Sequence, residues 1–202
     1  MRNQTGIRLV GLALTAGLLL PGCTTTSSPG GWVSTEGEQH ANEIALSADV
    51  PEGWSRWRSD RDITLTKDGM LLQMIRINRT EYGAVYENTD LTIQPGITPL
   101  EASQIIVEDM QANQKLRSLD LLDNRPANVA DHPGLRMEFT YKDDDNLKVH
   151  EIVYVALTPD SYVVARCRAP DRHYIEIVSG DFERIVASIR LDPPPTPGED
   201  PD

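Results

Sequence analysis

Residues 135–168 read LRMEFTYKDDDNLKVHEIVYVALTPDSYVVARCR, and this stretch decides the fold. Apolar and polar side chains alternate in segment 135–141, and segment 148–157 is apolar on both faces. In segment 162–168, Val163, Ala165 and Cys167 share one strand face. Only a few turn-forming residues separate one run from the next. Strands joined by such short turns are antiparallel neighbours, so the stretch predicts a meander within one sheet. The middle strand is expected to lie at its centre.

The region before this meander contains a predicted hairpin. Arg61–Lys67 alternates cleanly, Asp68-Gly69 is a strong turn signal, and Met70–Asn78 returns as a second strand. Apolar side chains on both faces of the returning strand indicate that both sides of the sheet are covered. Further upstream, we expect a short strand around Ile44 and Leu46, and then a turn at Val50–Trp54.

Two segments have helical signals. Thr98 is a good N-cap, Pro99 suits the first helical position and Glu101 completes a capping box, so we predict a helix to about Lys115. Near the C-terminus, apolar residues recur at helical spacing from residue 171 or 172 to about 189. Gly180 interrupts this second run, which predicts a kink or a break there.

Between the first helix and the meander we expect two separate short strands. They are Leu119–Leu122 and Ala127–Val129, divided by Asn124-Arg125-Pro126. The sequence of elements fits an α+β domain in which helices pack on a single antiparallel β-sheet.

The order of elements resembles a known fold. It is carried by Pro51–Trp54, the Asp68-Gly69 hairpin, the Thr98 helix, the meander and the closing Phe182–Leu191 segment. Over residues 43–191 these features resemble the PsbP-like α/β/α sandwich. That family consists mostly of non-enzymatic accessory and binding proteins, so the resemblance implies binding rather than catalysis. No functional residue of the family can be carried over, because the sequence contains no site motif to match.

The N-terminus carries an export signal. Arg2 and Arg8 precede the apolar run Leu9–Leu20, which is too short to span a bilayer and is typical of a signal peptide. Leu20-Pro21-Gly22-Cys23 resembles a bacterial lipobox, although Pro21 departs from the usual Ala, Ser or Thr. The resemblance implies cleavage between Gly22 and Cys23, diacylglycerol on the Cys23 sulfur, and a further acyl chain such as palmitate on the new amine.

The lipobox also predicts where the protein resides. The residue after the cysteine is Thr24 rather than Asp, which in the enterobacterial pattern implies the outer membrane, facing the periplasm. Several acyl chains anchor a protein durably, so the membrane is an expected partner through Cys23.

The predicted organisation has four parts. Residues 1–22 are a signal peptide, 23–42 a lipidated flexible tether, 43–191 the globular domain, and 192–202 a disordered, acidic, Pro-rich tail. Trp32 stands out in the tether, with two open roles: it dips into the membrane interface, or it caps the domain.

Charge and cysteine content limit the function. The formal net charge of −12 argues against a nucleic-acid partner, whose phosphates would be repelled. If Cys23 carries lipid, Cys167 has no disulfide partner, and its strand position predicts a buried thiol.

Few residues suggest chemistry. The four histidines have no metal-ligand spacing, and no nucleophile motif occurs, so we predict no catalytic residue, metal or cofactor. Arg79–Ile97 is long and irregular, as binding loops often are, and its Tyr82 and Tyr86 are candidate recognition residues.

The expected function is therefore that of a non-enzymatic, membrane-anchored periplasmic lipoprotein. It would bind a protein partner or assist envelope assembly. One alternative is a small-ligand carrier or sensor, of unknown ligand, with its site between the 79–97 loop and the sheet. Another is a hydrolase that uses His150 or His173.

Overall fold

The computed structural model describes residues 31–192. The predicted signal peptide, Cys23 and the tail from residue 193 onward lie outside them. The elements are β1 (Trp32–Ala41), a short 3-10 turn η1 (Asn42–Ile44), β2 (Leu46–Trp57), β3 (Ile63–Thr66), β4 (Met74–Glu81), α1 (Pro99–Ala112), β5 (Arg117–Val129), β6 (His132–Lys142), β7 (Lys148–Leu157), β8 (Ser161–Pro170), α2 (Tyr174–Ala187) and β9 (Arg190–Leu191). None of the described helices is long and apolar enough to cross a membrane.

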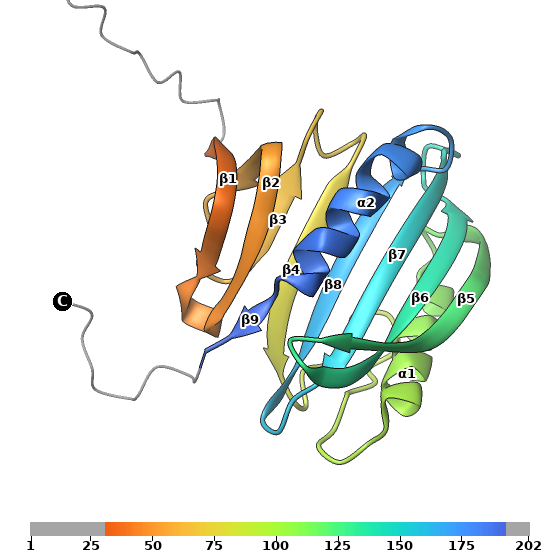
Figure 1. Cartoon of the computed structure of the whole chain (residues 1–202). Helices are drawn as coiled ribbons and strands as arrows, with labels where there is room; N and C mark the ends of the chain where they lie inside the picture. The colour runs from red at the N-terminus through yellow and green to blue at the C-terminus, as the bar shows by residue number, and fades with distance from the viewer. Residues whose placement is uncertain (1–30, 193–202) are drawn as a thin grey trace, which may run out of the picture.

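The described strands form one antiparallel sheet, as predicted. Its order is β1-β2-β3-β4-β8-β7-β6-β5, and β9 adds a short pairing to β2. The meander of β6, β7 and β8 is confirmed, and β7 lies between the other two. Figure 1 shows this sheet with α2 crossing in front of β4 and β8.

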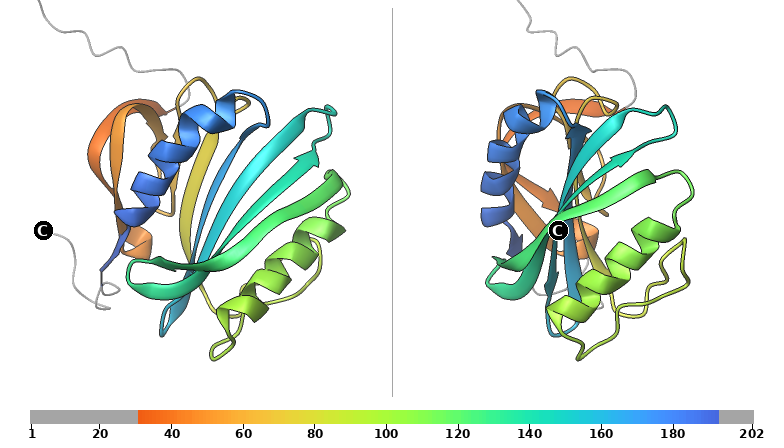
Figure 2. Two further views of the ribbon diagram at one scale, coloured as in Figure 1. Left: turned by 45° about the vertical axis from the view of Figure 1, so that its right-hand side comes forward. Right: turned by 90° about the vertical axis from the view of Figure 1, so that its right-hand side faces the viewer.

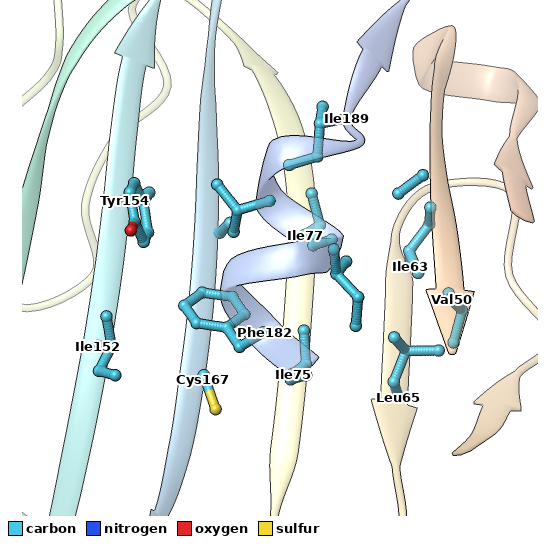
Figure 3. Close-up of a cluster of buried hydrophobic side chains, with 14 of the residues drawn as sticks. Val50, Ile63, Leu65, Ile75, Ile77, Ile152, Tyr154, Cys167, Phe182 and Ile189 are labelled. Carbon is cyan, nitrogen blue, oxygen red and sulfur yellow. The ribbon is translucent and has the colours of Figure 1, made fainter. Parts of the chain in front are cut away.

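One helix packs on each face of the sheet, which gives the α/β/α sandwich (Figure 2). On one face α2 buries Phe182 and Ile185 against β-strand residues such as Ile77 and Ile152, and Figure 3 shows part of this cluster. On the other face α1 and Ile93, from the loop before it, pack against Met137 and other residues of β6 and β7. Both faces of the central strands are therefore closed by packed side chains.

Local signals account for the boundaries of α1. The Thr98 hydroxyl accepts a hydrogen bond from the Glu101 N–H, and the Glu101 carboxylate accepts one from the Thr98 N–H, so the capping box is formed. The helix ends at Ala112, three residues before the predicted end at Lys115. Pro99 occupies the first turn, where its missing N–H costs nothing.

The N-terminal boundary of the domain was predicted too late. Residues 32–41, which we assigned to the tether, form β1 and pair with β2. Trp32 packs edge-on against Trp57, with ring centroids 5.5 Å apart, so in this structure it covers the domain. β1 is an edge strand with mostly exposed side chains, which is why it has no apolar alternation to reveal it.

Three predicted interruptions are absent. Pro51–Trp54 does not form a turn but continues β2, at the place where the register with β1 shifts, so Pro51 breaks no regular ladder. Pro126 does not divide β5, because β5 is an edge strand and an edge tolerates a missing N–H. Gly180 does not break α2, which runs continuously through it.

Asp192, which we assigned to the acidic tail, contacts the domain. Asp192 is held to the domain, because its N–H donates to the Ala45 carbonyl at 3.0 Å. The predicted hairpin is present, but the second strand starts at Met74 and the connection spans residues 67–73.

Candidate functional site

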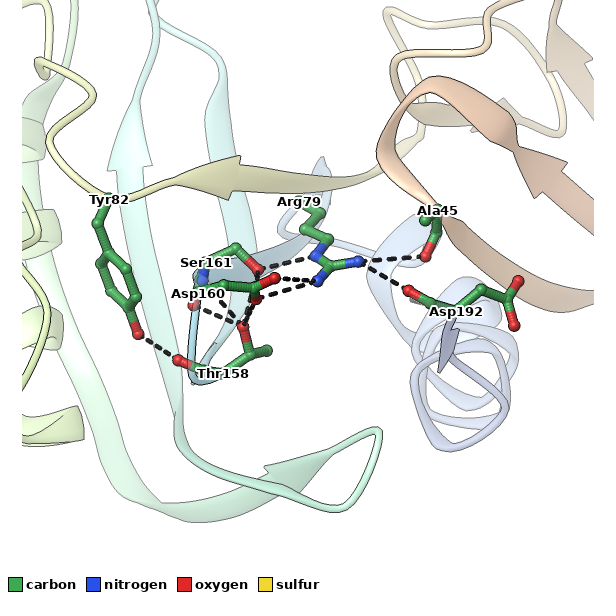
Figure 4. A network of polar contacts seen from close by, with 7 residues as sticks. All are labelled: Ala45, Arg79, Tyr82, Thr158, Asp160, Ser161 and Asp192. Atoms are coloured by element: carbon green, nitrogen blue, oxygen red, sulfur yellow. Dashed lines mark hydrogen bonds and ion pairs between the residues drawn. The ribbon is translucent and has the colours of Figure 1, made fainter. Parts of the chain in front are cut away.

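The clearest candidate site is a groove at one end of the sheet, where β4 ends and the 82–98 connection begins. Its walls come from η1 and Ala45, from Arg79, Glu81 and Tyr82, from Pro95, and from the turn between β7 and β8. The groove has a volume of about 470 Å³ and is open to solvent. We call it the Arg79 groove after the residue that organises it (Figure 4).

Arg79 joins three separate parts of the chain. Its Nε donates to the Ser161 hydroxyl at 2.8 Å, and its Nη2 donates to both carboxylate oxygens of Asp160 at 3.1 and 3.2 Å. Its Nη1 donates to the carbonyls of Asp192 at 3.1 Å and Ala45 at 3.5 Å. The side chain is only 11% exposed. All three nitrogens of the guanidinium are thus engaged within the protein, so Arg79 is a structural clamp and offers little to an anionic ligand.

The turn between β7 and β8 is ordered by its own polar side chains. The Thr158 hydroxyl donates to Asp160 at 2.9 Å and accepts from the Ser161 N–H at 3.0 Å. The Thr158 hydroxyl bond is the main cause that lowers the pKa of Asp160; burial opposes it, and Ser161 and Arg79 lower it further. Asp160 is therefore ionised at neutral pH and cannot act there as a general acid.

The predicted recognition residues Tyr82 and Tyr86 line two different hollows. The Tyr82 hydroxyl donates to the Thr158 carbonyl at 2.6 Å, which fixes its ring on the wall of the Arg79 groove. Tyr86 faces a smaller hollow of about 210 Å³ beside Tyr162 and Arg166. Burial raises the pKa of both tyrosines, so neither hydroxyl is a base near neutral pH. Tyr82 alone belongs to the groove.

The irregular 82–98 connection is held against the domain. Its own Ile93 is fully buried against the domain, and the Asn88 backbone and side-chain amides both donate to the Asp109 carboxylate of α1, at 2.9 and 3.0 Å. Val85, which forms an isolated bridge with Thr92, remains largely exposed. The connection therefore gives the groove a fixed wall.

His150 and His173, the two histidines of the hydrolase alternative, have no nucleophile among their hydrogen-bond partners in the described residues. The His150 ring lies between two carboxylates, with Nε2 2.7 Å from Glu138 and Nδ1 3.3 Å from Asp171. His173 caps the start of α2 without a side-chain hydrogen bond. Within residues 31–192, no serine, threonine or cysteine side chain forms a hydrogen bond with either ring, and Ser161 lies at the opposite end of β8 from Ala169, the residue that pairs with His150.

Two further expectations concern sulfur and metals. Cys167 is fully buried beneath α2, as predicted, and burial raises the pKa of its thiol. Across the described part of the chain, no group of three or more His, Cys, Asp or Glu side chains could hold a metal ion.

Sequence reasoning missed Arg79 and its partners. A signal was present: Ile75 and Ile77 point to the α2 face, and Arg79 follows them at the same period of two. A cation in line with a buried apolar face indicates a satisfied, partly buried charge. Its partners Asp160 and Asp192 are distant in sequence, so only the fold brings them to it.

Comparison with solved structures places the fold. The chain is similar to cyanobacterial PsbP from Synechocystis sp. PCC 6803 (TM-score 0.53, 13% identity, 86% of this chain and 99% of that chain covered). It is similar to LpqN of Mycobacterium tuberculosis, described as involved in cell envelope biogenesis (TM-score 0.53, 13% identity, 80% and 92% covered). It is also similar to the Saccharomyces cerevisiae Ran-binding protein Mog1p (TM-score 0.50, 12% identity, 79% and 96% covered).

These similarities define the class of fold: a single antiparallel sheet with a helix on each face, as in PsbP and Mog1. At 12–13% identity they concern the fold alone. No protein-family model and no curated protein sequence matches the chain.

Proposed function

We propose that the chain is a lipid-anchored protein of the bacterial cell envelope whose domain binds a protein partner and does not catalyse a reaction. The Arg79 groove carries this proposal, because it is a rigid, solvent-open surface whose walls come from several elements. The Arg79 guanidinium of the groove is already paired within the protein. Among the described residues that line the groove, no nucleophile is hydrogen-bonded to a histidine. Such a surface is built for recognition.

The anchoring half of the proposal rests on Leu20-Pro21-Gly22-Cys23 after the apolar run Leu9–Leu20. Lipid on Cys23 would hold the domain beside the membrane through the short segment before β1. Thr24 favours the outer membrane and a periplasm-facing domain. The fold shared with LpqN, a protein of cell envelope biogenesis, supports an envelope role, including assistance in envelope assembly.

Labelling tests the anchor. We expect cells grown with labelled palmitate to label the wild-type chain and Cys167→Ala, but not Cys23→Ala, and labelled chain to fractionate with the outer membrane. Cys167→Ala is the matched control, since it removes the buried cysteine and leaves the lipobox intact. A Cys23→Ala chain that is still processed and still pellets with membranes would disprove the anchoring role.

Site-specific crosslinking tests the partner. A photoreactive residue is placed in the full, anchored chain at Pro95, on the groove wall, or at Glu176, an exposed position on α2. In intact envelopes we expect a discrete protein adduct from position 95 and none from position 176. Equal labelling from the two positions, or no adduct from either, argues against a partner at the groove.

The small-ligand carrier is the second candidate. The specific observation in its favour is that Tyr82 lines a groove of about 470 Å³, within the size range of small-molecule sites. Native mass spectrometry of the protein purified from its own envelope distinguishes the two functions. A small molecule retained in stoichiometric amount and lost in Tyr82→Ala would favour the carrier.

A further inference from the structure

We infer that the Arg79 groove accepts a basic side chain, arginine or lysine, that the protein partner presents on an apolar segment. The inference rests on the proposed partner-binding function and names the chemistry of that partner. It depends on three features of the groove: which charges are already compensated, which walls are apolar, and how the charge of the whole chain acts on an approaching partner.

The first feature is the balance of charge. The groove is lined by three carboxylates, Glu43, Glu81 and Asp160, and by one cation. Arg79 and Asp160 neutralise each other, because the Arg79 Nη2 donates to both carboxylate oxygens of Asp160. Glu43 pairs at 2.8 Å with Arg61, but both of these side chains are largely exposed to water. Glu81 forms no ion pair and no side-chain hydrogen bond within residues 31–192. The groove therefore presents carboxylates that can pair with a cation, while its one cation, Arg79, is already paired.

The second feature is the apolar part of the wall. Ile44, Tyr82, Pro95 and Pro159 surround the carboxylates. Arginine and lysine carry their charge on an aliphatic stem, which packs along apolar surface while the head reaches an anion. The Tyr82 ring, held by its bond to the Thr158 carbonyl, adds a fixed aromatic face of the kind that attracts cations. An anionic or a neutral polar group could contact the apolar wall but could not form an ion pair with the carboxylates.

The third feature is the net charge of −12, which favours the approach of a basic partner over an acidic one. An acidic segment would meet Glu81 and Glu43 and would gain nothing from Arg79, whose nitrogens are all engaged. Charge complementarity therefore selects a basic segment of a protein as the occupant.

Fluorescence anisotropy with the full lipidated chain in nanodiscs provides the test. The probe is a labelled, capped peptide Gly-Leu-Pro-Arg-Leu-Gly, compared with the same peptide carrying Gln or Glu in place of Arg. We expect saturable binding of the arginine peptide, weaker binding of the Gln peptide and none of the Glu peptide. Affinity should fall as salt rises, since the pairing is with exposed carboxylates.

Variants locate the binding. Glu81→Gln should lower the affinity for the arginine peptide about two- to fivefold, as expected for one exposed ion pair. Tyr82→Leu, which keeps an apolar side chain but removes the aromatic face and the hydroxyl bonded to Thr158, should lower it by a similar factor of about two to five. Glu87→Gln is the matched control, because it removes the same charge from an exposed position of the neighbouring connection outside the groove. It should leave the affinity unchanged.

Three results would overturn the inference: equal affinity for the Arg and Gln peptides, equal effects of Glu81→Gln and Glu87→Gln, or no saturable binding up to millimolar peptide. If any of these occurs while position 95 still crosslinks a protein in envelopes, the partner-binding function stands and only its basic chemistry is wrong. If position 95 also captures nothing, the proposed function itself fails.

Discussion

Adding one methyl group at each of two glycines should change the stability of the domain in opposite directions. At Gly134, in β6, a Cβ atom would lie 2.1 Å from the Val155 carbonyl oxygen and 2.9 Å from the Ala156 Cα of the paired strand β7. At Gly180, in α2, a Cβ atom would meet nothing within 4 Å. Neither glycine has a positive φ, so backbone strain on the new side chain does not account for the difference between them.

The magnitudes follow from these contacts. The atom nearest to the added Cβ at Gly134 is backbone of a central strand, which cannot rotate away, so Gly134→Ala should cost about 3 kcal/mol, the upper end for overpacking. Gly180→Ala should stabilise by about 0.5–1 kcal/mol, since glycine is entropically costly inside a helix. For a domain of this size, these values correspond to a fall in melting temperature of roughly 6–12 °C and a rise of roughly 1–4 °C.

Urea denaturation followed by far-UV circular dichroism measures both changes at once. Gly134→Ala should lower the midpoint by roughly 1 M or more, while Gly180→Ala raises it slightly. Ala156→Gly should not rescue Gly134→Ala, because the closest clash is with the Val155 carbonyl and not with the Ala156 methyl group. A Gly134→Ala midpoint equal to wild type, or shifts of the same sign in the two variants, would refute the register that pairs Gly134 with Ala156.

The remaining predictions concern three individual side chains. Thr98→Ala should destabilise the domain by about 1 kcal/mol through loss of the capping box. Calorimetry measures this loss of stability, and Glu87→Ala, at an exposed position that caps no helix, is the control. The Cys167 thiol, whose pKa is raised by burial, should resist Ellman's reagent in the folded chain and react promptly in urea. Burial would raise the pKa of Asp181, but hydrogen bonds, first from Trp54, outweigh it and hold the pKa below its ordinary value. Its stabilisation is thus present above about pH 4 and is lost as pH falls through the lowered pKa, so Asp181→Asn should be less stable at pH 7 and lose less stability on acidification.

Local signals were sufficient for much of this fold. The strand patterns and short turns in residues 135–168 predicted three neighbouring strands, and β6, β7 and β8 form that meander. Thr98 and Glu101 predicted the start of α1 to the residue, because a capping box uses only neighbours in the chain. Such features are encoded within a few residues, so no knowledge of the rest of the molecule is needed to read them.

The edges of the sheet were harder to predict. β1 and β5 lie at its two ends, so each has partners on one side only and many exposed side chains. Their backbones pair with β2 and β6, and that pairing leaves no clear period in the sequence. The same exposure at an edge allows Pro126 to remain inside β5, where a proline would normally end a strand.

The candidate site could be predicted only in part, for a different physical reason. Tyr82 was chosen as a candidate because it lies in a long irregular segment, and such segments often carry binding residues. Arg79, Asp160 and Asp192 were not found, because their interaction joins a strand end, a turn and the chain beyond β9. No local pattern contains that information, since each of these residues is ordinary within its own segment.

The architecture also gives a reason for proposing recognition at the end of the sheet. α2 and α1 cover opposite faces, and the residues beneath them are closely packed. The strand ends are also accessible, and the chain crossings there leave polar backbone and charged side chains that must be satisfied. Arg79 does this at one end, binding the β7–β8 turn to Ala45 and Asp192. In doing so it fixes the relative position of three segments and leaves Glu81 and Tyr82 beside them on a rigid wall. The stabilising clamp and the proposed recognition surface are then the same structure, and this is why a charge change at Glu81 should alter binding with little effect on folding.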